Sequence, residues 1–201
     1  MKKTAKGKVQ KKKSVKDYNI KNMAQDVWPI ERDIFFRPGR MKYVRKLIKP
    51  EGCVFCKSAQ KKMHTDTLCV LKTEYSQIVV NKFPYNNGHV LVLPLRHIGD
   101  LLLLSEAEYN DLHKTLKLAV QAVKTVYNPH GFNLGLNHGA TGGAGIPEHL
   151  HYHIVPRWNG DLNFFPLIAE TKLVIEDPKS TYKKLRKYFS KIHIVNSRSV
   201  E

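Results

Sequence analysis

The stretch His149-Leu150-His151-Tyr152-His153-Ile154-Val155 alternates histidine with apolar or aromatic residues. Because successive side chains of an extended chain point to opposite faces, we expect the three imidazoles to share one face of a β-strand. Valine would pack such a face equally well, so packing gives no reason for three histidines. Histidine serves mainly in proton transfer, nucleophilic attack and metal ligation, and the stretch therefore predicts a functional strand.

Two kinds of chemistry could use this face. Neighbouring same-face residues lie about 6.6 Å apart along a strand, so His149 and His153 are about 13 Å apart, too far for all three imidazoles to bind one tetrahedral zinc ion. The alternative is covalent catalysis, in which one neutral imidazole attacks an electrophile while its neighbours orient it or protonate the leaving group. We favour the second, with phosphorus as the electrophile.

A glycine-rich loop precedes the histidines and has the sequence Gly139-Ala140-Thr141-Gly142-Gly143-Ala144-Gly145. Its backbone amides could cradle an anion, although it lacks the Gly-Lys-Ser/Thr ending of a P-loop and runs into a strand. An ordinary turn is the alternative. Because the loop directly precedes the histidines, we take Gly143, Gly145 and Ile146 as candidate phosphate-binding residues.

The stretch from Gly145 to Trp158 resembles the signature of the histidine triad (HIT) superfamily of nucleotide hydrolases and transferases. The continuation Arg157-Trp158-Asn159-Gly160-Asp161-Leu162-Asn163-Phe164 is similar to the branch of diadenosine tetraphosphate phosphorylases and related hydrolases, with Leu162 in place of the threonine expected there. The likeness runs from about residue 37 to about residue 182. It implies an α+β, HIT-like fold, a nucleotide substrate and a homodimer.

By this resemblance, His151 is the nucleophile that attacks the α-phosphorus of a dinucleoside polyphosphate and forms a nucleotidyl-histidine intermediate. A hydrogen bond from its other ring nitrogen to a backbone carbonyl should fix the tautomer. His153 would contact the α-phosphate oxygens. Two alternatives stay open: a nucleoside phosphoramidate hydrolase or other nucleotidyl transferase, and a nucleotide- or RNA-binding protein with residual catalysis.

Three further residues are candidates for nucleotide binding. The stretch from Asn81 to Pro94 joins two apolar runs through proline and Asn-Asn-Gly turn chemistry. The resemblance implies that Asn81 binds the ribose, that His89 lines the same pocket and that Asn137 contacts the phosphates. The residues alone would allow Asn81 to be a strand-end cap and His89 a buried core histidine.

Cys53-Val54-Phe55-Cys56 has the spacing of a zinc-ligand pair. His97 and His149 would complete a Cys2His2 set, an arrangement that some members of the superfamily use for structural zinc. A redox pair or two ordinary thiols are the alternatives. We expect structural zinc and no organic cofactor.

Charge divides the 201-residue chain, whose formal net charge is +17. Residues 1–22 carry a net charge of +8 and residues 179–201 carry +6. We predict a disordered lysine-rich arm over 1–22, a HIT-like catalytic domain over 23–178 and a basic C-terminal helix and tail over 179–201. The basic ends could contact nucleic acid or another polyanion, or could only solubilise the chain.

The apolar pattern predicts a largely antiparallel five-stranded sheet, with strands near 68–72, 76–81, 89–94, 132–137 and 149–155. Ser105-Glu106-Ala107-Glu108 is a capping box, and the helical periodicity after it ends at Asn128-Pro129. A basic helix is expected over 179–189. No apolar run approaches the about 18–20 residues that span a bilayer, and the three cysteines fit a reducing compartment, so we expect a cytoplasmic protein that does not bind membranes.

Overall fold

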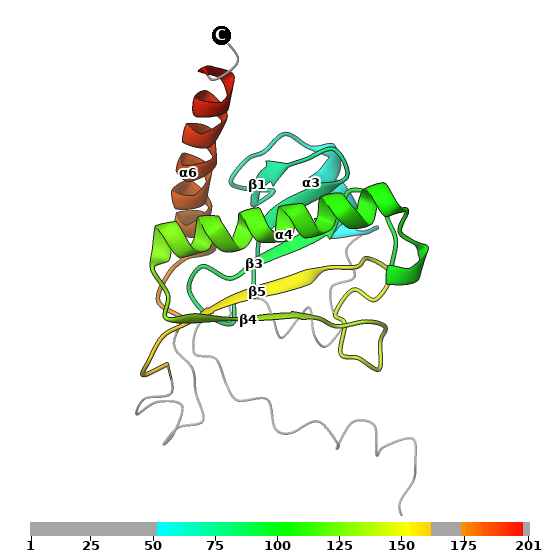
Figure 1. The fold of residues 1–201 in the computed structure, drawn as a ribbon. Coiled ribbons are helices and arrows are strands. Elements are labelled where there is room, and N and C mark those ends of the chain that lie inside the picture. The colour runs from blue at the N-terminus through cyan, green and yellow to red at the C-terminus, as the bar shows by residue number, and fades with distance from the viewer. Residues whose placement is uncertain (1–51, 162–173, 199–201) are drawn as a thin grey trace, which may run out of the picture. The chain divides into compact units, whose positions relative to one another are not determined.

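The computed structural model describes residues 52–161 and 174–198, with an α+β fold built on one antiparallel sheet. The sheet has five strands in the order β1-β2-β3-β5-β4 (Figure 1). The strands are β1 (Cys69–Lys72), β2 (Ser76–Val80), β3 (Val90–Pro94), β4 (Gly131–Leu136) and β5 (Tyr152–Arg157). The predicted fold class is thus confirmed. The arm predicted over 1–22 lies outside the described residues, and the division into 23–178 and 179–201 stays a prediction.

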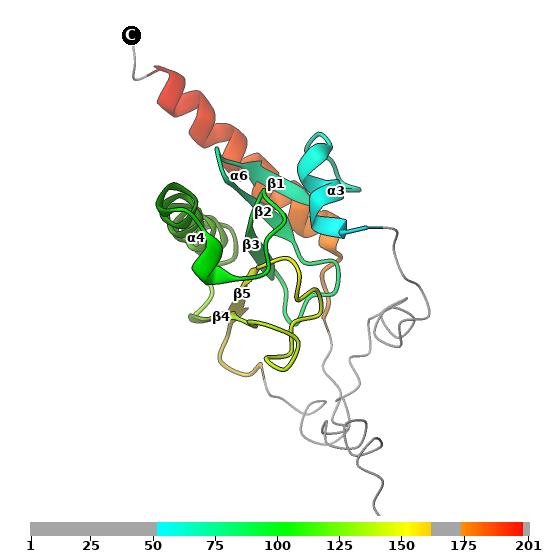
Figure 2. The ribbon, with the colours of Figure 1, turned by 90° about the vertical axis from the view of Figure 1, so that its right-hand side faces the viewer.

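Three α-helices of the described residues pack around the sheet. The long helix α4 (Glu106–Tyr127) packs on β2, β3 and β5, whereas α3 (Val54–Gln60) lies on the other side of the strands (Figure 2). The C-terminal helix α6 (Pro178–Arg198) contacts α4 and β1. None of the helices among the described residues has both the length and the apolar character of a membrane span. Both faces of the central strands are therefore covered.

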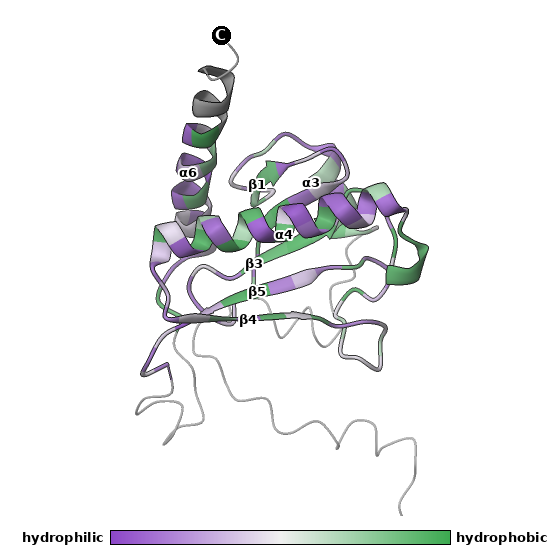
Figure 3. Cartoon of the chain, viewed as in Figure 1, coloured by the Kyte–Doolittle hydropathy of each residue, from purple (hydrophilic) through white to green (hydrophobic). Residues whose placement is uncertain are grey.

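The core lies between α4 and the sheet. All residues of β2 and β3 are buried, as expected for strands that are covered on both faces. Polar and apolar residues interchange along α4 (Figure 3), and its buried side chains include Leu112, Ala119 and Val123. Ile154 of β5 belongs to the same core and is fully buried. The alternate residues of β5, His153 among them, therefore face the side opposite α4.

The start of α4 confirms the predicted capping box. The Glu108 amide donates to Ser105 Oγ at 3.3 Å, and the Ser105 amide donates to Glu108 Oε2 at 2.8 Å. Arg96 adds a bidentate pair, from its Nε to Glu108 Oε1 at 2.6 Å and from its Nη2 to Oε2 at 2.8 Å. This pair holds the pKa of Glu108 down at about 2. The helix ends at Asn128, which adopts the left-handed conformation with φ 45°.

The predicted strand over 149–155 begins too early, because β5 starts at Tyr152 and leaves His149 and His151 outside the ladder. Val92 pairs with Tyr152, so the same register would place Pro94 opposite Leu150. Proline has no N–H and cannot continue the ladder. The Leu150 amide instead donates to the Ile98 carbonyl at 2.7 Å. The other four strands lie within one or two residues of their predicted limits.

Glu108→Gln is expected to lower the free energy of unfolding at neutral pH by about 1–2 kcal/mol, because it removes the charged partner of Arg96 and weakens the cap. The folded-state pKa of Glu108 lies below its ordinary value, so this stability is present above pH 4.5 and is lost as the pH falls through about 2. Urea unfolding of both proteins over this range measures the difference. Glu106→Gln, in the same helical turn, is the control, and a difference independent of pH would contradict the assignment.

Candidate functional site

The histidines of the motif gather on the side of the sheet opposite α4. His153 pairs with Leu91 of β3 and with Gly135 of β4, so it lies on a central strand. The His151 ring lies 5.1 Å from the His153 ring, measured between centroids. His149 and His151 are both buried. The predicted clustering of the motif on one side of the sheet is thus present, although the first two histidines precede the strand.

A single hydrogen bond fixes the tautomer of His151. Its Nδ1 lies 2.8 Å from the His149 carbonyl oxygen, which only accepts, so Nδ1 carries the proton. The expected hydrogen bond to a backbone carbonyl is therefore present. Burial lowers the pKa of His151, and this hydrogen bond opposes part of that effect. The neutral ring consequently has a lone pair on Nε2, which is the form that a nucleophile requires.

A second chain of hydrogen bonds orders His89 and His153. The Tyr85 amide donates to His89 Nδ1 at 3.0 Å, so the neutral His89 ring carries its proton on Nε2. His89 Nε2 lies 3.0 Å from His153 Nδ1 and donates to it. The neutral His153 ring therefore carries its proton on Nε2. Burial, and then the nearby His151, lower the pKa of His153 to about 4.

The loop between β2 and β3 also supplies groups that surround these two rings. Tyr85 stacks on His153 with 5.8 Å between ring centroids and an 18° interplanar angle. Asn81 Nδ2 lies 3.3 Å from His89 Nδ1, and Asn81 Oδ1 accepts from the Phe83 amide at 2.9 Å. Asn81 thus shapes the turn and lies beside His89, which fits the strand-end cap weighed from the sequence. Its contact with ribose stays a prediction.

Cys53, Cys56, His97 and His149 form a cluster whose ligand atoms all lie within 4.8 Å of one another. Cys53 Sγ and Cys56 Sγ lie 3.3 and 3.6 Å from His149 Nδ1, and Cys56 Sγ lies 3.3 Å from His97 Nδ1. Tetrahedral zinc with ordinary bond lengths places sulfur and nitrogen ligands about 3.6 Å apart. The structure therefore brings the four predicted metal ligands together at distances that suit this ion.

A hydrogen bond from Nε2 orients the His149 ring in the way that a metal-ligating histidine requires. Its Nε2 donates to the Pro94 carbonyl at 2.9 Å, which leaves the unprotonated Nδ1 directed at the two thiols. Burial lowers the pKa of His149 to about 4, so the ring stays neutral. His149 therefore has two structural roles. Its side chain completes the Cys/His cluster, and its backbone carbonyl accepts a hydrogen bond from His151 Nδ1.

Phe55 connects the cluster with the candidate nucleophile. Its ring centroid lies 5.4 Å from that of His149 and 5.1 Å from that of His151. The buried Gln77 of β2 donates from Nε2 to the Phe55 carbonyl at 3.1 Å and so fixes α3 against the sheet. Phe55 was not predicted as part of the site. Its position between two cysteines of a ligand pair was the available signal.

The segment that carries His97 approaches the motif very closely. A Cβ atom at Gly99 would lie under 3.0 Å from the Pro147 carbonyl oxygen, a distance that real structures do not show, and 3.0 Å from the Cα of Glu148. Only glycine allows this approach, which brings His97 within reach of His149. Gly99 was not predicted as part of the site, because one isolated glycine carries no local signal of a contact about 50 residues away.

The glycine loop is held together by its own hydrogen bonds. Asn137 Nδ2 donates to the Gly143 carbonyl at 3.3 Å, and the Gly143 amide donates to Ala140 at 3.0 Å. The Ile146 carbonyl accepts from the His149 amide at 3.2 Å and so turns the chain into the motif. A side chain at Gly145 would meet open space. The Gly143 amide is thus used inside the loop, and the phosphate contacts of Asn137, Gly143, Gly145 and Ile146 stay predictions.

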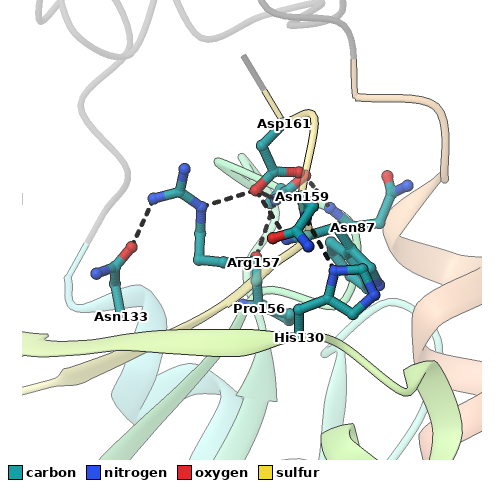
Figure 4. A network of polar contacts seen from close by, with 9 residues as sticks. Asn87, His130, Asn133, Pro156, Arg157, Asn159 and Asp161 are labelled. Carbon is teal, nitrogen blue, oxygen red and sulfur yellow. Dashed lines mark hydrogen bonds and ion pairs between the residues drawn. The ribbon is translucent and has the colours of Figure 1, made fainter. Parts of the chain in front are cut away.

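A polar network at the far end of β5 fixes the loop that carries Tyr85 (Figure 4). Asp161 Oδ2 accepts from Arg157 Nε at 2.7 Å, from the Trp158 amide at 3.1 Å and from Asn86 Nδ2 at 3.0 Å. The buried Asn86 also donates to the Pro156 carbonyl at 2.9 Å. Asn86, the residue next to Tyr85, is therefore anchored to β5, which is the strand that carries His153.

The fold and the site together define an α+β protein with three motif histidines on the side of its sheet opposite α4. Residues 62–160 match the family model of the HIT domain. Within these residues the chain is similar to the histidine triad family.

Similar proteins agree with this assignment. The AP-4-A phosphorylase of Mycobacterium tuberculosis (strain ATCC 25618 / H37Rv) is 39% identical over 118 residues, which cover 59% of this chain and 60% of that protein. The asymmetrical bis(5'-nucleosyl)-tetraphosphatase of Schizosaccharomyces pombe is 34% identical over 92 residues, with 46% and 50% covered. The chain thus spans at most 60% of the length of these two relatives. The crystal structure of a hypothetical histidine triad nucleotide-binding protein from Sulfolobus tokodaii has a TM-score of 0.55 and 26% identity, and covers 70% of this chain and 93% of that one.

His153 is expected to stay neutral, with its proton on Nε2, as the pH falls from 6.5 towards about 4. Because the folded-state pKa lies below the ordinary value, its contribution to stability is present above pH 6.5 and is lost as the pH falls through about 4. Imidazole nitrogen chemical shifts in NMR spectra report the tautomer and the titration directly. The urea-unfolded chain is the reference, and a folded His153 that titrates with it would contradict the hydrogen-bond chain.

Proposed function

We propose that this protein is a HIT-type enzyme that cleaves dinucleoside polyphosphates, of the diadenosine tetraphosphate type, at the α-phosphate. The observation that carries the proposal is the buried His151, whose Nδ1–H donates to the His149 carbonyl and whose Nε2 keeps its lone pair. Two similar proteins have the names AP-4-A phosphorylase and bis(5'-nucleosyl)-tetraphosphatase, which supports the same substrate class.

In the first step, His151 Nε2 attacks the α-phosphorus, a P–N bond forms and the P–O bond to the leaving polyphosphate breaks. The hydrogen bond to the His149 carbonyl stabilises the positive charge that develops on the His151 ring. In the second step, water or orthophosphate attacks the same phosphorus and releases the nucleotide from His151. Two steps with a covalent nucleotidyl-histidine intermediate thus replace one difficult displacement.

His153 is the donor nearest to the reacting group. Its Nδ1 accepts from His89, so its Nε2–H can donate to an α-phosphate oxygen as negative charge develops there. The Tyr85 amide at the start of this chain keeps both tautomers fixed. In the proposed complex Asn81 and His89 line the ribose pocket, and Asn137 and the glycine loop approach the phosphates.

A nucleoside phosphoramidate hydrolase or another nucleotidyl transferase would use the same nucleophile, and a nucleotide-binding protein with residual catalysis would share the pocket. The reaction products separate these functions. ADP and ATP formed only with orthophosphate identify a phosphorylase, whereas AMP and ATP formed with water identify a hydrolase.

We also propose that Cys53, Cys56, His97 and His149 bind structural zinc. Thiolate and imidazole donors are the ligands that tetrahedral zinc prefers, and the Pro94 carbonyl supplies the hydrogen bond that orients His149. Bound zinc would hold α3 to the motif and contribute folding free energy, without taking part in the reaction.

The proposal includes a cytoplasmic homodimer. The strand β4 forms one edge of the described sheet, and its Leu134 side chain is 51% exposed. An edge strand with an exposed apolar residue is suited to pairing with a second copy of the chain.

The substitution His151→Asn is expected to lower kcat for diadenosine tetraphosphate by at least about a thousand-fold, because asparagine retains a polar side chain but has no nucleophilic ring nitrogen. Nucleotide affinity should change little. Chromatography of the products, with and without orthophosphate, and calorimetric titration with AMP measure the two effects. The control is His64→Asn, at an exposed position. Normal turnover by the His151 variant, or no turnover by the unmodified protein, would overturn the proposal.

Purified protein is expected to hold about one zinc ion per chain, and Cys56→Ser should lose most of it together with several degrees of melting temperature. Elemental analysis measures the metal and scanning calorimetry measures the stability. The matched control is Cys69→Ala, which removes a buried thiol outside the cluster and should retain the ion. Equal zinc content in the two variants would reject this site.

A further inference from the structure

The helix α6 carries an exposed row of lysines that the proposed reaction does not use. Lys179, Lys183, Lys187 and Lys191 follow one another at four-residue spacing, and all four are exposed. Because residues four apart lie on the same helix face, these side chains form one row about 18 Å long. We call this set the lysine row.

Nothing in α6 balances this charge. The sequence of the helix contains no aspartate or glutamate. Among the ion pairs of the described residues, Lys184 pairs with Glu176 at 2.7 Å, and no described pair includes the lysine row. Like charges at four-residue spacing destabilise a helix. The lysine row therefore weakens α6 in the isolated protein, and a polyanion bound along it would remove that repulsion.

The other side of α6 fixes the lysine row to the domain. Tyr182, Leu185 and Phe189 are 7%, 1% and 3% exposed, and all three belong to the hydrophobic core. The row is thus displayed on a packed helix. The same burial argues against an anionic membrane as the partner, because a helix that lies in a membrane interface needs its apolar face for the lipid.

Further cationic side chains lie between α6 and α3. Both helices lie beside β1, as Figures 1 and 2 show. The helix α6 packs against β1, and Arg186 of α6 and Lys72 of β1 both oppose the effect of burial, which raises the pKa of the Cys69 thiol. Lys72 Nζ in turn donates to the Lys61 carbonyl at 2.7 Å. Lys57, Lys61 and Lys62 are exposed around the end of α3.

We propose that the lysine row is a binding surface for the phosphate backbone of nucleic acid, with no reading of its sequence. Lysine ammonium groups match phosphates as point charges, and their neutralisation releases counterions, which makes such binding strongly dependent on salt. All four positions of the row are exposed lysines, so the contact is made through charge. This surface is independent of the proposed reaction at His151.

The test compares two triple variants of the full chain. The row variant carries Lys183→Gln, Lys187→Gln and Lys191→Gln, and the control variant carries Lys114→Gln, Lys117→Gln and Lys124→Gln, three exposed lysines of α4. Both variants lose the same net charge and keep the nine lysines of residues 1–22, so effects of total charge and of that arm cancel between them.

Binding is measured by fluorescence anisotropy with a labelled single-stranded RNA of about 20 nucleotides over a series of salt concentrations. The row variant should lose affinity about tenfold or more, and the slope of log K against log salt should fall by about two. The control variant should stay within about twofold of the unmodified protein. Lysine-to-arginine changes at the three row positions keep the charge and should preserve binding.

Equal losses in the row and control variants would overturn the proposal, as would binding of phosphatidylserine vesicles by the unmodified protein without binding of RNA. A loss of affinity in the arginine variant would also overturn it, since the charge is then not the cause. Turnover of diadenosine tetraphosphate should be the same in all variants, and the melting temperature of the row variant should be no lower than that of the unmodified protein, because the change removes like-charge repulsion along α6. A failure of this surface therefore stays distinguishable from a failure of the proposed reaction.

Discussion

The hydrogen bond from His149 Nε2 to the Pro94 carbonyl connects the two parts of the candidate site. It leaves His149 Nδ1 to face the thiols of Cys53 and Cys56, and the backbone of the same residue accepts from His151. His149 is fully buried, so loss of this partner would leave an unpaired donor in the interior. The orientation of the candidate metal ligands and that of the candidate nucleophile therefore depend on one carbonyl group at the end of β3.

Proline at this position also decides where the strand pairing stops. A residue with an N–H at position 94 could extend the ladder opposite Leu150, and His149 and His151 would then lie in a regular strand. The separation of about 13 Å between the first and third histidines would follow from that geometry. Because the pairing of β3 with β5 ends at Val92 and Tyr152, the chain turns instead, and His149 joins the cysteines while His153 stays on the sheet.

Local sequence patterns were sufficient to predict much of the fold. The capping box and apolar periodicity of α4, and the approximate positions of all five strands, follow from residues close together in the chain. The grouping of Cys53, Cys56, His97 and His149 was also predicted, with help from the family resemblance. The start of β5 was not, because it depends on a proline in a partner strand about 60 residues earlier.

The missed parts of the site share a physical reason. The Phe55 ring lies between the rings of His149 and His151. Gly99 allows its segment to approach Pro147 and Glu148 closely, and Tyr85 contributes its backbone amide. Each depends on contacts made only after folding, and a backbone donor has no signature in the identity of its side chain. Titratable and metal-ligating side chains, by contrast, can be recognised from their residue type alone.

The use of a backbone amide at position 85 has a consequence for genetic variation at the site. The donor that sets the tautomers of His89 and His153 belongs to the main chain, so every replacement of Tyr85 except proline keeps it. The side chain at position 85 can therefore change, and with it the surface that faces His153. The directions of the hydrogen bonds to His89 and from His89 to His153 stay the same. Tolerance of substitution at this position is thus a property of the main chain, in a loop whose Tyr85 side chain lies against His153.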